Sequence, residues 1–218
     1  MKFYFDICDK LRNNEPFKFS RWGDGEFGCM YGWEGANRDG NKYLPELRQD
    51  LIDIIHSEPN YYIGLQPGVM VDVGRGYVPD LREYILHTIF KLRLNLVIGD
   101  TLHYASEFGY LHRLIDALKD RNVFMIGAEY FSKLPYKIIV TEGANSYPDN
   151  DEIIQRAFEM QQGWNDPVFL VASAMNSNVI IDKLPNDVTA IDIGSVFDPY
   201  LGIPRATYQR SMKFEWLW

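Results

Sequence analysis

Strand-like and helix-like segments alternate along the whole chain, and this alternation limits the folds that the sequence can adopt. Short runs of aliphatic, β-branched and aromatic residues are separated by longer segments in which apolar residues recur at helical spacing. The expected strands are 17–22, 61–65, 94–98, 123–126, 138–140, 168–171 and 188–193, and the expected helices are 2–13, 45–58, 79–92, 106–120, 150–163 and 176–184. Units of this size predict a Rossmann-like α/β domain with a mostly parallel sheet flanked by helices.

The composition is that of one globular domain over residues 1–218. A chain of 218 residues with 46% hydrophobic and 24% charged residues can bury one substantial core, and no repeat or linker-like stretch divides it. The formal net charge of −8 argues against nucleic acid as a main partner, because phosphate backbones are held by basic surfaces. A nucleotide ligand remains compatible with this charge, since a bound cation can reverse the local field.

Several features of the sequence predict a cytoplasmic protein without a transmembrane segment. Cys8 and Cys29 have no metal-binding spacing and are expected to be free thiols in a reducing compartment. The first residues lack the apolar run of a signal peptide, and no apolar stretch is long enough to span a bilayer. The aromatic residues 214–218 are expected to pack on the domain or on a partner chain, which leaves a homodimer open.

The segment Arg21-Trp22-Gly23-Asp24-Gly25-Glu26 ends the first expected strand. We predict that the chain breaks at the two glycines and places Asp24 and Glu26 on an exposed turn, where the backbone can approach a ligand closely. Two carboxylates separated by one residue can converge on Mg²⁺ or Mn²⁺. Arg21 and the amides around Gly23 suit phosphate oxygens. The segment therefore predicts a metal-bridged diphosphate site.

The same glycines allow two other interpretations. Gly23-x-Gly25-x-x-Gly28 matches the dinucleotide-binding fingerprint, which follows a strand and opens a helix. The glycine- and aromatic-rich stretch 28–43 predicts a loop instead, and the fingerprint seldom places two acids where a pyrophosphate must bind. The acids near the distance expected for a ribose ligand lie within the expected helix 45–58. An acidic turn with a purely structural role is the second alternative.

The motif Arg21-x-Gly23-Asp24-Gly25-Glu26 after an N-terminal helix resembles the signature of the GT-D-fold glycosyltransferases. That family has an Asp-x-Glu metal motif in place of the Asp-x-Asp of other nucleotide-sugar enzymes. The resemblance, which spans most of the chain, implies a GT-D-like fold. It also implies transfer of a sugar from a nucleotide sugar, a UDP-sugar most of all, to a glycan or other hydroxyl acceptor. Asp24 and Glu26 would then hold Mn²⁺ or Mg²⁺ against the diphosphate.

A second stretch near the C-terminus also resembles the family, which tends to have an Asp-x-Gly there. Asp192 and Gly194 match this pattern, but Ser195 stands where a histidine is expected in family members. The departure leaves the catalytic base and the last metal ligand open. Asp198 and Asp100 are the candidates if the reaction inverts the anomeric centre, whereas a retaining reaction needs no such base.

Other candidate nucleotide-sugar ligands follow expected strands or lie in loops. They are His103, Asn145, Ser173, Asp192 and Arg205. In parallel sheets, ligands bind outside the carboxyl ends of the strands, where most of these residues are expected. Ordinary structural roles stay open for four of them: a hydrogen-bonded histidine at 103, close helix–strand packing at Ser173, a buried structural acid at Asp192, and a surface arginine at 205.

The aromatic residues of the loop 28–43 can be read in two ways. Tyr31, Trp33 and Tyr43 could stack on a sugar or a base, or they could pack within the loop. For the protein as a whole, a non-catalytic nucleotide- or glycan-binding module and a metal-dependent phosphoesterase are the alternatives to a transferase.

Overall fold

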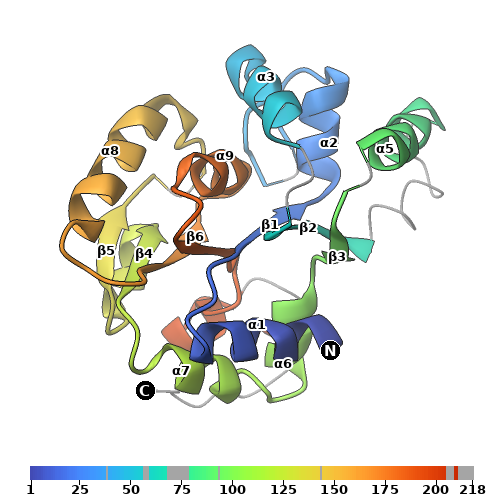
Figure 1. The fold of residues 1–218 in the computed structure, drawn as a ribbon. Coiled ribbons are helices and arrows are strands. Elements are labelled where there is room, and N and C mark those ends of the chain that lie inside the picture. The colour runs from blue at the N-terminus through green and yellow to red at the C-terminus, as the bar shows by residue number, and fades with distance from the viewer. Residues whose placement is uncertain are drawn as a thin grey trace.

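A parallel β-sheet forms the middle layer of the molecule (Figure 1). The computed structural model describes residues 1–37, 39–55, 59–67, 79–92, 94–142, 144–204 and 209–210. Within these ranges the strands are β1 (Lys18–Trp22), β2 (Tyr61–Leu65), β3 (Leu96–Ile98), β4 (Val123–Gly127), β5 (Lys137–Val140), β6 (Val168–Ala172) and β7 (Thr189–Asp192). Their order is β3-β2-β1-β7-β6-β4-β5, and neighbouring strands pair in parallel. The predicted α/β architecture is therefore confirmed.

Helices cover both faces of this sheet (Figure 1). One layer contains α2 (Asp24–Tyr31), α3 (Pro45–Ile54), α5 (Pro79–Leu92), α8 (Asn150–Gln161) and α9 (Asn176–Lys183). The other contains α1 (Lys2–Arg12), α6 (Thr101–Glu107) and α7 (His112–Leu118), with the short 3₁₀ helices η1 (Glu129–Lys133) and η3 (Asp198–Leu201). A further 3₁₀ turn, η2 (Tyr147–Asp149), precedes α8. Among the described helices, none combines the length and apolar character needed to cross a bilayer.

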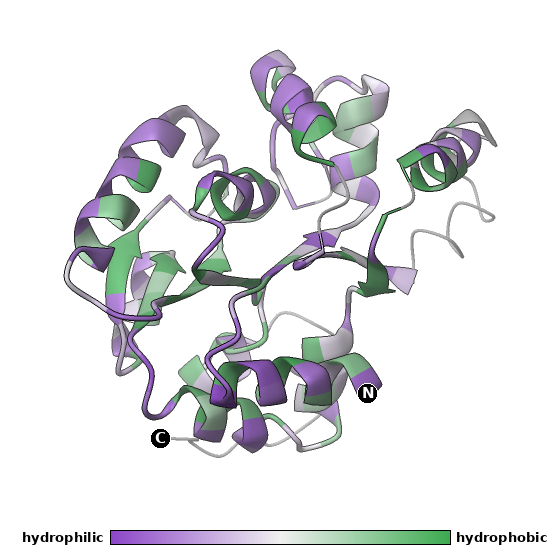
Figure 2. Cartoon of the chain, in the orientation of Figure 1, coloured by the Kyte–Doolittle hydropathy of each residue, from purple (hydrophilic) through white to green (hydrophobic). Residues whose placement is uncertain are grey.

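The strands separate two hydrophobic cores. Along β4, Phe124 and Ile126 pack into the core under α8 and α9, whereas Met125 points to the core on the opposite face. Because both faces are covered, β4 and β6 are apolar almost without interruption, and Figure 2 shows these strands as hydrophobic. This continuous apolar character explains why the strand positions were predictable from the sequence.

The strand order creates a divergence between β1 and β7. The chain leaves β1 for β2 and β3 on one side, crosses under the sheet through α6 and α7, and returns beside β1 only with β7. In open parallel sheets, ligands bind at such a point, outside the carboxyl ends of the strands. Here those ends carry Arg21 on β1 and Asp192 on β7.

Helix α2 stands where an exposed turn and a loop were expected, so that prediction was wrong. Five of its eight residues, Gly25, Phe27, Gly28, Cys29 and Met30, are buried. A helix buried on most sides has no alternation of polar and apolar faces, which is the signal used to recognise helices in a sequence. The glycines fit the same crowding, since a Cβ at Gly28 would collide with the ring of Trp33.

The expected helix 106–120 corresponds mainly to α7, and its first two residues are the end of α6, which already begins at Thr101. Helix α6 ends at Glu107 and α7 begins at His112. Gly109 between them has a φ of 75°, in the left-handed region that a continuing helix cannot use. The apolar residues on both sides keep the same spacing, so the break was not evident from periodicity.

Candidate functional site

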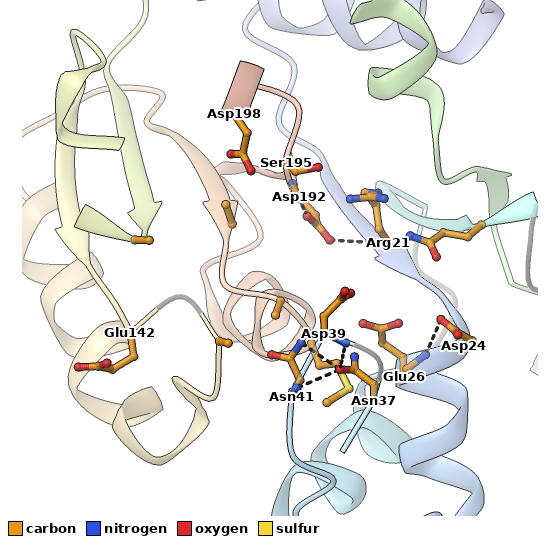
Figure 3. A pocket seen from close by; sticks show the side chains of 18 of the residues that line it. Arg21, Asp24, Glu26, Asn37, Asp39, Asn41, Glu142, Asp192, Ser195 and Asp198 are labelled. Atoms are coloured by element: carbon orange, nitrogen blue, oxygen red, sulfur yellow. Dashed lines mark hydrogen bonds between the residues drawn. The ribbon is translucent and has the colours of Figure 1, made fainter. Parts of the chain in front are cut away.

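A cavity of about 730 Å³ opens at the carboxyl ends of β1 and β7 (Figure 3). Its described lining is strongly acidic, with the carboxylates of Asp24, Glu26, Asp39, Glu142, Asp192 and Asp198. Arg21 is the one lysine or arginine among the described lining residues. An anionic ligand in this cavity would therefore meet mostly like charge.

Glu26 enters the cavity from the first turn of α2. Its Oε2 accepts a hydrogen bond from the backbone N–H of Gly23 at 2.7 Å, which caps the helix start. The side chain is half-buried. Burial raises the pKa of its carboxyl to about 7, and the nearby Asp192 carboxylate adds to the shift while Arg21 opposes it. Glu26 therefore lies on a helix and half-buried, and not on the exposed turn that was predicted.

Asp24 lies two residues earlier and is exposed, as predicted. Its Oδ1 accepts a hydrogen bond from the N–H of Gly25 at 3.0 Å. Side chains two residues apart on a helix do not face each other, so the helix does not by itself bring Asp24 and Glu26 together. In Figure 3, Glu26 points into the space near Asp192 and Asp39, and Asp24 lies at its edge.

Asp192 ties the two central strands together. Its Oδ2 accepts from the backbone N–H of Arg21 at 3.3 Å, and its Oδ1 accepts from the N–H of Gly194 at 2.9 Å. The residue is 6% exposed, and burial raises its pKa against the opposing effects of Arg21 and these two hydrogen bonds. Asp192 is thus a hydrogen-bonded structural acid that also lines the cavity, which unites the two roles considered for it.

The guanidinium of Arg21 is held from two sides. Its Nη2 lies 3.3 Å from Oδ1 of Asp100, which directly precedes α6. Gly194 has a φ of 48°, and a Cβ at this position would collide with Nη1 of Arg21. The arginine therefore occupies the space that only a glycine leaves open.

A serine–histidine pair lies beside this arginine. Nε2 of His103, on the first turn of α6, is 3.2 Å from Oγ of Ser195. Burial, together with the charge of Arg21, holds the pKa of His103 well below its ordinary value. Ser195 lines the cavity, whereas Asp100 and His103 are not among its described lining residues.

Asp198, the other candidate base, is buried at the start of η3 and lines the cavity. Tyr130, which follows β4, donates a hydrogen bond from its hydroxyl to Oδ1 of Asp198 at 3.0 Å. This bond orients the carboxylate of Asp198.

Two predicted ligand residues have structural partners. Ser173 is 1% exposed, its hydroxyl lies 3.1 Å from that of Thr141, and its N–H donates to Oγ of Ser177. Asn145 accepts from the N–H of Lys42 at 2.7 Å and donates to the carbonyl of Gly40 at 3.2 Å. Neither is among the described residues that line the cavity. Arg205 lies outside the described residues.

Of the three aromatic residues considered in the loop, Trp33 and Tyr43 pack against the core and Tyr31 is exposed. Trp33 and Tyr43 contact each other with ring centroids 6.3 Å apart and pack against the core, and Tyr31 contacts Tyr84. Among the described residues, Tyr130 is the aromatic side chain that lines the cavity.

Several cavity residues were not predicted. They are Asn37, Asp39, Asn41, Gln66, Tyr130 and Glu142. In the loop 28–43 only the aromatic residues were considered from the sequence, and not Asn37, Asp39 and Asn41. Gln66, Tyr130 and Glu142 follow β2, β4 and β5, so the strand-end rule that found Asp192 would also have found them.

The β1–α2 connection matches the dinucleotide-binding fingerprint in one respect, because β1 leads through Gly23 into a helix. Two observations still disfavour a dinucleotide site. Asp24 and Glu26 occupy the helix start where a pyrophosphate would bind. The residue after β2 is Gln66, and not the acid that would hold a ribose.

The donor atoms of the cavity suit a hard divalent cation, which prefers carboxylate and amide oxygens. Within the described residues, no group of three His, Cys, Asp or Glu side chains could hold a metal ion by itself. Magnesium in nucleotide enzymes is commonly bound through one or two carboxylates, with water and substrate phosphates completing its shell.

No protein-family model and no curated protein matches the sequence. Solved structures do match. One, presented as a new glycosyltransferase (DUF1792) from Streptococcus sanguinis, superposes with a TM-score of 0.67 at 17% identity, covering 97% of this chain and 92% of that chain. Another, presented as domain of unknown function 1792 with a distinct glycosyltransferase fold, has a TM-score of 0.61 at 17% identity, with coverage of 88% and 76%. A selenomethionine-substituted structure of the same domain gives 0.60, at the same identity and coverage.

This chain has that glycosyltransferase fold. The likeness extends over nearly the whole chain. The fold expected from the GT-D resemblance is thereby confirmed. At 17% identity the likeness concerns the fold alone, and the chemistry must be argued from the cavity.

Proposed function

We propose that this protein is a metal-dependent glycosyltransferase that moves a sugar from a UDP-sugar to a hydroxyl of a glycan acceptor. The observation that carries the proposal is the acidic cavity with Arg21 at the divergence of β1 and β7, within a glycosyltransferase fold. A solved structure with the same fold is itself presented as a glycosyltransferase.

The negative charge of the cavity supports the proposal that a metal ion binds together with the diphosphate. Six carboxylates and a single arginine form its described charged lining, and a nucleoside diphosphate brings further negative charge. Two like charges 4 Å apart near a protein surface repel by about 4 kcal/mol, so a diphosphate needs a cation between itself and these acids. Glu26 and Asp24 would hold Mn²⁺ or Mg²⁺ together with the phosphates. When bound, the ion would stabilise the charge that develops on the departing diphosphate.

Arg21 would bind the same diphosphate from the opposite side. Its guanidinium is oriented by Asp100 and by the space over Gly194 before any ligand binds. Binding would therefore cost little conformational entropy in this side chain. Charge-assisted hydrogen bonds from arginine to phosphate are among the stronger polar contacts.

The other side of the cavity suits the sugar acceptor. Oδ1 of Asn37 accepts from the N–H groups of Asp39 and Asn41 at 3.0 and 2.9 Å, which shapes a tight loop over the cavity. Carboxylate and amide groups of this kind bind sugar hydroxyls. For transfer with inversion, Asp198 is the base we propose, because it lines the cavity and Tyr130 orients it.

The test is a turnover assay with a panel of UDP-sugars in MnCl₂, in MgCl₂ and in EDTA, with UDP release followed by mass spectrometry. We expect metal-dependent UDP release from at least one donor, and loss of it in Glu26→Gln. The matched control is Glu152→Gln, which changes the corresponding residue in the first turn of α8. Binding of UDP without turnover of any donor would favour a non-catalytic module. Failure to bind UDP with metal present would overturn the proposal.

A further inference from the structure

Ser195 is held rigidly on the wall of the cavity. Its carbonyl accepts from the N–H of Asp198 at 3.2 Å and from Nε2 of Gln209 at 2.8 Å. The preceding Gly194 lies between the side chains of Arg21 and His103. A Cβ at Gly194 would collide with Nη1 of Arg21 and lie 3.6 Å from Cε1 of His103. The backbone of Ser195 is therefore held in place, and Figure 3 shows Ser195 and Arg21 on the same wall of the cavity.

His103 supplies a hydrogen-bond partner for that hydroxyl from outside the cavity. The distance from its Nε2 to Oγ of Ser195 is 3.2 Å. A neutral imidazole has one donor nitrogen and one acceptor nitrogen, and a serine hydroxyl has one proton and two lone pairs. The direction of this hydrogen bond therefore decides what Ser195 presents to a ligand.

If Nε2 carries the proton and donates, the serine keeps its own proton for the cavity. If Nε2 accepts, the serine proton is used and only lone pairs face the ligand. Phosphate oxygens accept hydrogen bonds and cannot donate them at neutral pH. The first arrangement therefore suits a diphosphate, and it gives two adjacent donors, Arg21 and Ser195, on one wall.

We propose that Ser195 donates a hydrogen bond to the diphosphate of the donor, and that His103 positions it by donating from Nε2 to its Oγ. The proposal rests on the proposed function and adds a residue to its donor-binding wall. The low pKa of His103 agrees with a neutral ring that acts as a fixed donor and does not exchange protons with the acceptor.

Calorimetric titration of UDP and of inorganic pyrophosphate in MgCl₂ tests the contact. Loss of a hydrogen bond to a charged group predicts that Ser195→Ala weakens both ligands by about tenfold or more. The control Ser132→Ala changes an exposed serine of η1 and should bind as the wild type does. Equal binding by the wild type and Ser195→Ala would overturn the proposal and leave the proposed function intact. Absence of binding by the wild type would overturn both.

Substitutions of His103 test its positioning role. His103→Gln keeps an amide donor near Nε2 and should retain binding within about threefold, whereas His103→Leu should weaken it as Ser195→Ala does. Because His103 acts through Ser195, the double variant should bind no more weakly than Ser195→Ala alone. Additive losses would contradict the positioning role.

Nuclear magnetic resonance gives a measurement that needs neither a ligand nor a variant. ¹⁵N correlation spectra of the imidazole rings should show His103 as the Nε2–H tautomer. A ring protonated on Nδ1 alone would overturn the proposed direction of the hydrogen bond, whatever the binding data show.

Discussion

Nη2 of Arg21 lies 3.3 Å from Oδ1 of Asp100, and this ion pair joins the end of β1 to the start of α6. The side chains are 13% and 30% exposed, so the pair is partly shielded from water. It is the structural reason for treating Asp100 as a residue that orients Arg21. The sequence had also suggested Asp100 as a catalytic base, and the two roles lead to different outcomes.

Asp100→Asn should weaken UDP–Mg²⁺ binding by about three- to tenfold, because Arg21 loses the partner that orients it. Stability should fall by less than about 1 kcal/mol, as is usual for a partly exposed pair. Arg21→Ala should weaken binding by more than tenfold. Calorimetry and thermal melting measure both quantities. Unchanged UDP binding combined with abolished turnover in Asp100→Asn would instead assign the catalytic role to Asp100.

Glu26 should make the metal-free protein less stable at pH 8 than at pH 5.5. The pKa of its carboxyl is about 7 in the folded protein, against an ordinary value of 4.5. Between these two pH values the folded protein keeps a proton on Glu26 that the unfolded chain has lost. The stabilisation is complete below pH 4.5 and is lost as the pH rises through about 7. The expected contribution is about 1–2 kcal/mol, since the side chain is only half-buried.

Urea unfolding from pH 5.5 to 8 measures this contribution. Glu26→Gln should flatten the dependence while keeping the cap on Gly23, and Glu152→Gln should leave it as in the wild type. Asp192, whose pKa is also raised, gives a residual slope of the same sign in every variant. Added Mn²⁺ should stabilise the wild type more at pH 8 than at pH 6. An unaltered slope in Glu26→Gln would contradict the assignment.

Gly194→Ala should disturb Arg21 more than it disturbs folding. The added Cβ meets the end of the arginine side chain rather than backbone atoms, so the side chain can shift at little cost in stability but loses its position. The left-handed backbone adds about 1–2 kcal/mol of strain. Gly163 also has a positive φ, of 80°, and a Cβ there would meet nothing within 4 Å.

Gly194→Ala and the control Gly163→Ala should therefore lose similar stability. Only Gly194→Ala should weaken UDP–Mg²⁺ binding, by about tenfold. Thermal melting and calorimetry of the pair separate backbone strain from displacement of Arg21. Equal binding by both variants would show that the position of Arg21 does not matter for the ligand.

Asn145 should control the loop that carries Asp39 and Asn41. Its side chain bonds the backbone of Lys42 and Gly40 across more than a hundred residues of sequence. Because its φ is 60°, Asn145→Gly keeps the backbone conformation and removes only the side-chain bonds. We expect faster amide hydrogen exchange at 39–42 and a higher KM for the acceptor, with the affinity for UDP unchanged. Exchange at wild-type rates would show that the loop is held by other contacts.

The sequence predicted the sheet well, because strands such as β4 and β6 are buried on both faces and appear as uninterrupted apolar runs. Helix α2 was missed for a related reason: a helix buried on most sides lacks the regular alternation of polar and apolar faces that marks its period. Predicting Glu26 as an exposed ligand followed from that error.

The composition of the cavity could be predicted only in part. Arg21, Asp24, Glu26, Asp192 and Asp198 were identified from motifs and strand ends, and they do line one cavity. The adjacency of β1 and β7, on which that cavity depends, is a long-range property that no local pattern contains. The contact between His103 and Ser195, 92 residues apart, depends on the same strand order.

The central claim is that Glu26 and Asp24 hold a divalent cation against a nucleoside diphosphate, and calorimetric titration of UDP with and without MnCl₂ tests it most directly. Glu26→Gln and Asp24→Asn remove one charge each, and Glu152→Gln and Asp151→Asn are the matched changes in the first turn of α8. The account predicts metal-dependent binding by the wild type and both controls, and loss of at least tenfold in the two α2 variants. Metal-independent binding, or α2 variants that bind UDP–Mn²⁺ as the wild type does, would contradict it.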